Sequence, residues 1–448
     1  MANESQVNRL SGSVRKNMII YAVPLILSGL LQILYNSADL IVVGKFAGTS
    51  ALASVGATSS LLNLIVTVFL NFSVGVSVVV AKEIGAGNKN RISDSIGTSY
   101  FLAGVFGAAV LIIGITCSEF FLELMKTPAD IIDGSTLYMK IYFLGVPASL
   151  VYNFGAAVIS AAGDTKRPLY YLTFSGIVNI ILNLVLVIVF KLSVAGVAIA
   201  TTVSQYVSAF FVTRNLIMRK DECRLLVNKI RFYKNEVKKI VEVGLPAGIQ
   251  GAAFSLSNVV IQSSINIFGK TVIAGNTASA NIEAFTYTAM NGVSRTTLNF
   301  AAQNVGAGNK ERMPSILWYS ILYELVVGGV MGIISVVFAH TLLGFYVDDA
   351  QAIMYGTSRL WYIAFPYFMC GIMEVGANMV RASDHPVLPA ISTIVGVCGL
   401  RMIWIAIAFP IRKTPETVYL SYIISWTITA VFHFICYYVI SKKRLKEE

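Results

Sequence analysis

The chain has 448 residues, of which 56% are hydrophobic and only 13% are charged, whereas soluble proteins have about a quarter charged residues. This composition leaves no room for a large soluble domain and indicates a helical membrane protein. The net charge of +11 does not indicate nucleic-acid binding, because no basic stretch outside the apolar segments is interleaved with aromatic residues.

The N-terminal segment, residues 1–16, is polar and contains Arg9, Arg15 and Lys16. The apolar run after it is long enough to span a bilayer, so we expect the first transmembrane helix there and no cleavable signal peptide. Further segments of similar length follow, and the loop 218–240 is the only long connection between them. In chain order the twelve expected helices lie near 17–41, 52–81, 96–117, 137–161, 168–190, 194–216, 241–268, 272–301, 314–339, 357–381, 387–410 and 417–440.

Basic residues are distributed unevenly between the two sides of the membrane. With the N-terminus inside, the cytoplasmic segments hold about three times as many Lys and Arg as the outer segments. Arg359 is assigned to the outer side, whereas Arg295 and Arg401 fall inside helices. The bias predicts that both termini are cytoplasmic.

The two halves of the chain share motifs at a constant spacing of about 220 residues, which indicates an internal repeat. Six helices per repeat is an even number, so the two halves have the same membrane orientation. We therefore expect an N-terminal six-helix lobe (1–216), a cytoplasmic linker (217–240) and a C-terminal six-helix lobe (241–448). Parallel repeats are typical of transporters with a substrate site between the lobes. The paired motifs are GAGNK at Gly85–Lys89 and Gly306–Lys310, Pro24 and Pro246, Pro147 and Pro366, and the turns at 161–168 and 381–389.

Polar residues in the first half recur at helical spacing. Gln32, Asn36 and Asp39 lie four and three residues apart, so they share one face of the first helix. Asn179 and Asn183 lie four apart on the fifth helix, at a similar depth to Asp39. We interpret Asp39 and these two Asn as a cation or proton site. The alternatives are a headgroup position for Asp39 and interhelical packing bonds for the two Asn.

The seventh, eighth and tenth helices of the second half also carry polar side chains. Glu283 lies roughly 16 Å from the outer end of its helix, near the membrane midplane. The alternative for Glu283 is a structural ion pair. Together with two residues of the first helix, these side chains predict a substrate cavity lined by Gln32, Asn36, Asn258, Gln262, Glu283, Glu374 and Asn378.

An intramembrane carboxylate offers a simple exchange mechanism. A carboxylate in a low-dielectric cavity tends to hold a proton, and it binds either that proton or another cation. One charge that moves through 100 mV provides about 2.3 kcal/mol, which is enough to bias two packed arrangements of the lobes.

Several segments resemble the multidrug and toxic compound extrusion (MATE) family, and the likeness covers essentially the whole chain. The most specific are LYNSADLIVVGKFAGTSALASVG at 34–56, the paired GAGNK loops, and VISAAGDTKRP at 158–168. AGIQGAAFSLSNVVIQSSIN and QNVGAGN are similar to the DinF-like branch. The resemblance implies a V-shaped pair of six-helix lobes around a central cleft.

The resemblance also implies site residues. Asp39 matches the first-helix aspartate of the family, Asn179 matches its fifth-helix Asn, and Thr201 or Thr202 matches its sixth-helix Thr, of which we take Thr202. The family pattern NxxxD on the fifth helix reads Asn179-xxx-Asn183 here, so a second carboxylate is missing. No acid follows shortly after Pro246, unlike in the NorM branch.

The sequence therefore predicts a monomeric, cation-coupled antiporter of the cell membrane. It is expected to export small, mainly cationic organic compounds by alternating access between two lobes. The coupling ion is H⁺ or Na⁺, and no other cofactor and no metal besides Na⁺ at Asp39 is expected. The five Cys lack CxxC spacing and the three His are scattered, so neither a zinc site nor a disulfide framework is indicated.

Other functions are less consistent with the sequence. A lipid-linked precursor flippase of the same superfamily is the alternative, but flippases of that kind usually have extra helices and an Arg-rich cavity. An enzyme is disfavoured because HExxH and GxSxG motifs are absent. A channel is disfavoured because the polar stripes form no continuous charged ring.

Overall fold

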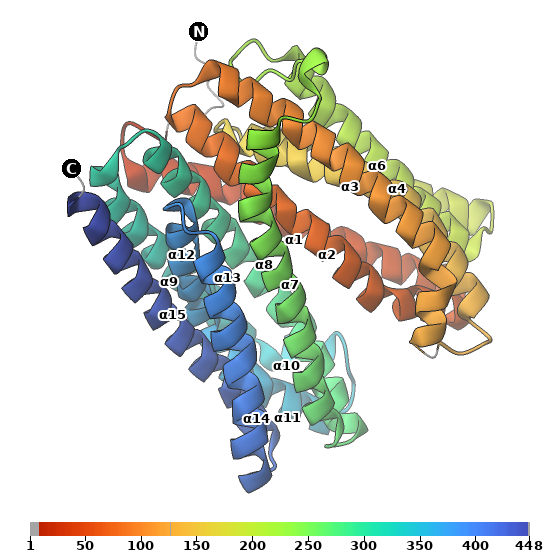
Figure 1. Cartoon of the computed structure of the whole chain (residues 1–448). Helices are drawn as coiled ribbons and strands as arrows, with labels where there is room; N and C mark the ends of the chain where they lie inside the picture. The colour runs from red at the N-terminus through yellow and green to blue at the C-terminus, as the bar shows by residue number, and fades with distance from the viewer. Residues whose placement is uncertain (1–8, 126, 447–448) are drawn as a thin grey trace. The chain divides into compact units, whose positions relative to one another are not determined.

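The computed structural model describes residues 9–125 and 127–446, and this part of the chain contains helices and no strands (Figure 1). Each of the twelve expected segments is helical. The long helices of the first half are α1 (Val14–Val42), α2 (Thr49–Gly85), α3 (Lys89–Leu124), α4 (Ile132–Ala161), α5 (Lys166–Leu184) and α6 (Ser193–Met218). The second half contains α7 (Lys234–Asn266), α8 (Lys270–Gly306), α9 (Met313–Val337), the short α10 (Ala339–Gly344), α11 (Ala350–Arg359), α12 (Phe368–Ala382), α13 (Val387–Thr393), α14 (Leu400–Ile411) and α15 (Pro415–Lys446).

Most of these helices have the length and composition needed to cross a membrane. Among the described residues, 11 helices meet both requirements, if α11 is counted with α12 and α13 with α14. In lipid every backbone N–H and C=O must be bonded within its own segment, which a helix achieves. The twelfth segment, α8, is of spanning length but more polar, because residues such as Asn276, Glu283 and Thr297 are buried against neighbouring helices.

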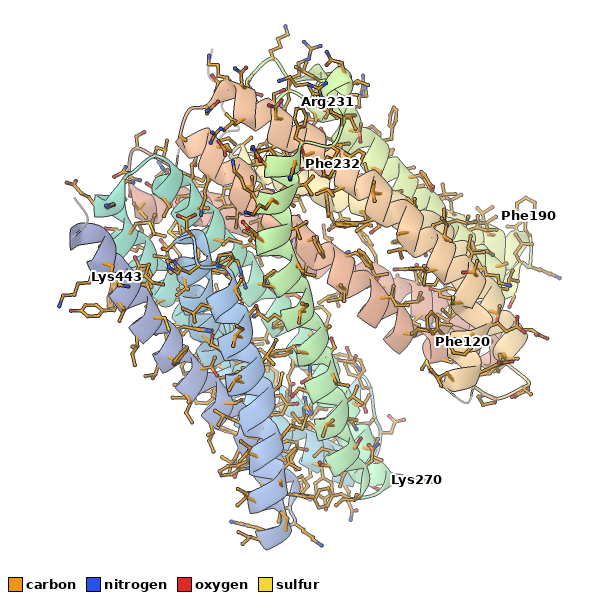
Figure 2. All side chains as sticks on the ribbon, viewed as in Figure 1. Phe120, Phe190, Arg231, Phe232, Lys270 and Lys443 are labelled. Atoms are coloured by element: carbon orange, nitrogen blue, oxygen red, sulfur yellow. The ribbon has the colours of Figure 1, made fainter. Side chains whose placement is uncertain are left out.

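The outer faces of the helices are apolar. Phe120 and Phe190, for example, are more than half exposed and point away from the helices that carry them (Figure 2). In water such faces would be sites of aggregation, whereas in a bilayer they contact lipid tails. The exposed apolar side chains therefore fit the membrane assignment made from composition.

The repeated GAGNK motif forms the same turn in both halves. Its second Gly adopts a positive φ in each copy, 68° at Gly87 and 67° at Gly308, just after the helix that precedes it. Gly adopts this left-handed conformation at the end of a helix without the steric cost that a Cβ brings. In the first copy the Asn88 side chain also accepts a hydrogen bond from the backbone N–H of Arg91 at 3.2 Å, which caps α3.

The chain divides into two compact units that share helices α1 and α7. Unit 1 comprises Leu27–Gly248, and unit 2 comprises the described part of Asn8–Ile26 together with that of Ile249–Glu448. In both shared helices the division falls two residues after a Pro, at Pro24 and Pro246. Proline removes a backbone hydrogen bond and weakens a helix locally, so each shared helix has a weak point close to the division.

The segment expected as a linker is part of unit 1 and packs against its α3 helix. Lys229 forms an ion pair with Asp94 at 2.8 Å, and Ser95 donates a hydrogen bond to Glu236 at 2.7 Å. The backbone of Lys229 lies so close to Gly97 of α3 that a Cβ there would overlap it. The segment 217–240 is thus held by specific contacts. The lobe boundaries at 1–216 and 241–448 stay predictions.

The first half of α1 and the residues just before it pack within unit 2. The Asn304 side chain of α8 donates a hydrogen bond to the backbone carbonyl of Arg9 at 3.1 Å. The rings of Tyr21 and Phe300 meet edge to face, with their centroids 5.5 Å apart. Residues far apart in sequence thereby complete one packed unit.

Candidate functional site

Asp39 lies on α1 in unit 1, and a tight contact with α5 positions it. A Cβ added at Gly176 of α5 would overlap the ring of Tyr35, so this glycine allows α1 and α5 to approach closely. The Tyr35 hydroxyl also donates a hydrogen bond to the Thr173 carbonyl at 3.4 Å. Because Asp39 lies one turn beyond Tyr35, its carboxylate reaches the next polar residues of α5.

Both carboxylate oxygens of Asp39 accept hydrogen bonds from neutral side chains. The Asn183 amide donates to Oδ1, and the Thr201 hydroxyl of α6 donates to Oδ2 at 3.3 Å. The Asn179 amide donates to Thr201 at 3.5 Å, and Asn183 donates to the Asn179 oxygen at 3.3 Å. We call Asp39, Asn179, Asn183 and Thr201 the aspartate cluster. The three residues expected from the polar stripes are thus in contact.

The aspartate cluster is acidic and partly buried, because Asp39 and Thr201 are half-buried and the two Asn are buried. Asn179 is 4% exposed and Asn183 is 1% exposed. Among the described residues, no Lys or Arg forms an ion pair with Asp39, and the Asn183 Oδ1 atom is buried without a hydrogen-bond partner. A carboxylate, an unpartnered amide oxygen and a hydroxyl are the oxygen ligands that a hard cation prefers, and a carboxylate equally accepts a proton.

The hydroxyl in the cluster belongs to Thr201, and not to Thr202 as expected. Thr202 instead donates to the Ile141 carbonyl of α4 at 2.8 Å. Consecutive residues on a helix point about 100° apart, so only one of the two can face Asp39. Gln32 and Asn36 are exposed on α1 and lie outside the cluster.

No group of three or more His, Cys, Asp or Glu in the described part of the chain could hold a metal ion. The Cys in this part are free, so none of them forms a disulfide. Any cation at Asp39 would be held by one carboxylate and neutral oxygens. Such a site suits a weakly bound, transported ion more than a structural metal.

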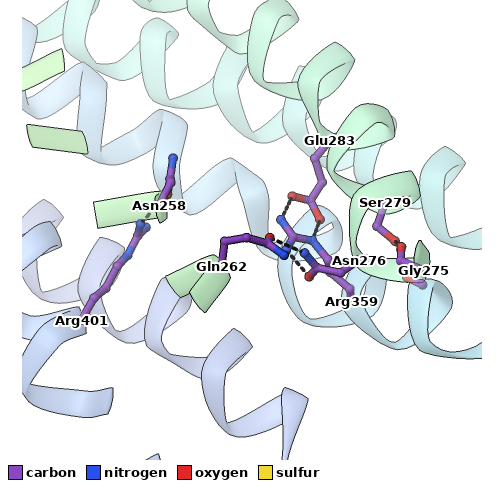
Figure 3. A network of polar contacts seen from close by, with 9 residues as sticks. Asn258, Gln262, Gly275, Asn276, Ser279, Glu283, Arg359 and Arg401 are labelled. Carbon is purple, nitrogen blue, oxygen red and sulfur yellow. Dashed lines mark hydrogen bonds and ion pairs between the residues drawn. The ribbon is translucent and has the colours of Figure 1, made fainter. Parts of the chain in front are cut away.

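In unit 2, Glu283 is part of a buried ion pair (Figure 3). The Arg359 guanidinium of α11 donates to both oxygens of Glu283, from Nε at 2.8 Å and from Nη2 at 2.7 Å. Its Nη1 donates to the Asn276 oxygen at 2.5 Å, and the Asn276 amide donates to Gln262 at 2.8 Å. Arg359 is only 7% exposed and is the last residue of α11, and its assignment to the outer side stays a prediction.

Arg401 of α14 is a second buried cation, and it has no carboxylate bonded to it in the described residues. Its Nε donates to the Ser425 hydroxyl at 3.1 Å. Its Nη1 donates to the Asn258 oxygen at 3.4 Å (Figure 3). Its guanidinium lies 4.1 Å from the ring centroid of Tyr422 and 5.7 Å from that of Trp426. Aromatic rings replace a counter-ion here through cation–π contacts.

The tenth expected helix carries two residues expected to line the substrate cavity, Asn378 and Glu374, and they lie in different surroundings. The Asn378 amide donates to the Ser294 hydroxyl at 2.7 Å and its oxygen accepts from Arg381, so both ends of its side chain are used in a buried network. Glu374 is half-buried. The roles expected for these residues and for Gln262 and Asn258 in a substrate cavity stay predictions.

Helices in both units contain π-helical turns close to these polar side chains. The turn Val43–Ala47 follows α1 one turn after Asp39, and Val185–Val189 follows α5 just after Asn183. In unit 2 the turn Leu360–Ala364 begins directly after Arg359. Such turns often mark functional positions, because they move a side chain out of the regular helical register.

A family model described as MatE matches the chain twice, at residues 24–185 and at residues 246–407. The chain belongs to the multidrug and toxic compound extrusion (MATE) family. The two matches confirm that this MATE protein is built from two repeats, as the paired motifs predict. Its place in the DinF-like branch stays a prediction.

Known proteins resemble this MATE protein over most of its length. The Probable multidrug resistance protein YoeA of Bacillus subtilis (strain 168) is 26% identical over 399 residues, which is 87% of this chain and 86% of YoeA. The FAD transporter of Shewanella oneidensis is 23% identical over 404 residues, which is 89% of this chain and 88% of that protein. A crystal structure of MATE in complex with MaL6 has a TM-score of 0.92 and 20% identity, with 100% of both chains covered.

These similarities fix the class of protein. The structural likeness shows that the fold is the MATE fold, and membership of the family makes the chain a multi-pass membrane transporter. The expectation that it is not an enzyme fits this class.

Proposed function

We propose that this MATE transporter exports small, mainly cationic organic compounds in exchange for H⁺ or Na⁺ that enters through the aspartate cluster. The observation that carries the proposal is the Asp39 carboxylate, which is bonded by neutral donors and has no cationic partner among the described residues. A single negative charge in the membrane is stabilised by whichever cation reaches it. A proton, a sodium ion and an organic cation therefore compete for it.

Competition at one carboxylate couples the two fluxes. When the inward-moving ion occupies Asp39, the site is neutral and binds an organic cation weakly; when the ion leaves, the charge returns. We propose that two arrangements of the lobes expose the site alternately to the two sides of the membrane. The multidrug resistance named in YoeA supports export of varied organic compounds.

The lipid-linked precursor flippase is less consistent with the residues of unit 2. Such a substrate carries phosphates, which need several unpaired basic side chains. The charge of Arg359 is neutralised by Glu283, and Arg401 is covered by aromatic rings. We therefore favour a cationic substrate.

The test is transport into proteoliposomes with a pH gradient or a sodium gradient imposed separately. The wild-type protein is expected to move a fluorescent organic cation under one gradient only, which identifies the coupling ion. A parallel measurement with FAD in place of the organic cation tests the substrate named for the Shewanella relative. Asp39→Asn is expected to abolish transport while it leaves folding intact, whereas the control Asp348→Asn, at an exposed acid, is expected to transport normally. Normal transport by Asp39→Asn would remove the site on which the proposal depends.

We also propose that both termini are cytoplasmic and that the protein works as a monomer in the cell membrane. The excess of Lys and Arg on that side supports the orientation. A reporter that fluoresces only in the cytoplasm, fused to the C-terminus, is expected to be bright. Size measurement in detergent tests the monomer.

A further inference from the structure

Glu324 of α9 is a buried acid that the aspartate cluster and the Arg359 network do not use. Its side chain is 0% exposed, and both carboxyl oxygens lack a hydrogen-bond partner in the described structure. It lies roughly 16 Å from the start of α9 and roughly 20 Å from its end, at 1.5 Å per residue. This places it in the middle of an apolar layer about 30 Å thick.

The carboxyl of Glu324 occupies a space that a glycine leaves open. A Cβ added at Gly371 of α12 would overlap Oε2 of Glu324. One turn further along α9, a Cβ at Gly328 would lie 2.9 Å from the Cα of Phe368. Glu324 and Gly328 belong to a buried stripe of α9 with a spacing of four residues. The two helices therefore approach closely, with the carboxyl held at their seam.

The charges that face Glu324 give it no compensation. From α12, Glu374 and Cys370 are close enough to interact with it electrostatically, and α8 contributes the uncharged Met290 nearby. In the described part of the chain no Lys, Arg or His pairs with Glu324. The basic residue nearest along α12, Arg381, donates to Asn378 and Gln250 instead.

A charged carboxylate is not tolerated in such a place. Without hydrogen bonds or a cation, and with a second acid beside it, the ionised form would be strongly disfavoured relative to the neutral acid. The geometry points to Glu324 as a proton-binding site of unit 2, which is occupied when α9 and α12 are packed as seen here and emptied when their seam opens. On release, the O–H bond of Glu324 breaks and its proton passes to the half-buried Glu374 carboxylate or to water, leaving a carboxylate behind.

The use of this proton in export rests on the proposed function, whereas its binding does not. With Asp39 in unit 1, Glu324 would give each unit of the transporter an acid that binds a proton. We therefore expect proton exchange and substrate exchange both to depend on Glu324, a residue that no polar stripe of the sequence includes. A purely structural acid would stay protonated throughout and play no part in exchange.

The test compares full-length wild-type protein with Glu324→Gln, Glu324→Asp and the control Glu311→Gln, at an exposed acid. Gln has the shape of the neutral acid, so we expect Glu324→Gln to fold normally and to lose at least tenfold in transport rate. Glu324→Asp keeps a carboxyl group that can bind a proton, so its transport rate is expected to lie between those of Glu324→Gln and wild type. In infrared pH titrations of the purified protein, an absorption of a protonated carboxyl should vanish in Glu324→Gln and persist in Glu311→Gln.

Wild-type protein provides a second measurement if the variants do not fold. Dicyclohexylcarbodiimide reacts with protonated carboxyls in apolar surroundings, and mass spectrometry of peptides is expected to find it on Glu324 at acidic pH and not at alkaline pH. Wild-type transport by Glu324→Gln, or no label on Glu324 at any pH, overturns the inference and leaves the proposed function standing. Normal transport by Asp39→Asn together with loss of transport in Glu324→Gln would overturn the proposed function and support the role of Glu324 as a proton-binding site.

Discussion

Removal of one charge from the Glu283–Arg359 pair should destabilise the protein strongly, and removal of both should not. Glu283→Gln leaves the guanidinium buried without a counter-charge, because its remaining contact in the network is the neutral Asn276. Removal of one partner of a buried pair costs about 3–5 kcal/mol because it leaves an uncompensated buried charge, whereas removal of both leaves no such charge. The free energy of unfolding of the double variant Glu283→Gln/Arg359→Gln is therefore expected to be closer to the wild-type value than that of Glu283→Gln alone.

The assay is denaturant unfolding of the purified protein in detergent, followed by tryptophan fluorescence. Glu242→Gln is a matched control, because the Lys238–Glu242 pair is exposed and its atoms are 3.7 Å apart, and such pairs are worth about 0–1 kcal/mol. If Glu283→Gln is no less stable than Glu242→Gln, the burial argument fails. If the double variant is stable and transports normally, the pair is structural and Glu283 does not contact substrate.

Two further predictions concern the aspartate cluster. Thr201→Val removes the hydroxyl that donates a hydrogen bond to Asp39, and a hydrogen bond to a charged group is worth about 1.5–3 kcal/mol. This variant should therefore reduce the transport rate at least tenfold. Thr202→Val is the control and should leave the transport rate near that of wild type, because Thr202 bonds to Ile141 instead. Gly176→Ala places a methyl group on the ring of Tyr35 and should destabilise the protein by about 1–3 kcal/mol and slow transport. Gly104→Ala, whose new methyl group meets nothing within 4 Å, is the matched control and should be neutral or stabilising. Equal effects of the members of either pair would contradict the contacts described.

Helical periodicity predicted the part of the site that lies within single helices. Asn179 and Asn183 repeat every four residues, so their shared face follows from the sequence, and the first-helix stripe points to Asp39. Periodicity does not say which of two adjacent residues on a third helix completes a site. For that reason Thr201 could be separated from Thr202 only in the structure.

The burial of charged residues within the helices of unit 2 was harder to predict from the sequence. Arg359 stands near the start of the expected helix 357–381, where the sequence gives no sign of a partner, yet it is buried in an ion pair with Glu283. Glu324 gives no pattern because its neighbours in α9 are apolar, although a single acid inside an otherwise apolar segment is a signal in itself. Eleven of the twelve spans, in contrast, follow from length and hydrophobicity among the described residues, whereas α8 is more polar than these criteria allow.

The packing of the residues that lead into α1 sets an order of events during synthesis. Asn304 bonds to the backbone of Arg9 across 295 positions of the chain. At a translation rate of about 5–20 residues per second, Arg9, which lies just before α1, is made roughly 15–60 s before Asn304. Over that interval the ribosome delivers nearly all of unit 1, so the earliest-made stretch of the protein is among the last to reach its final neighbours.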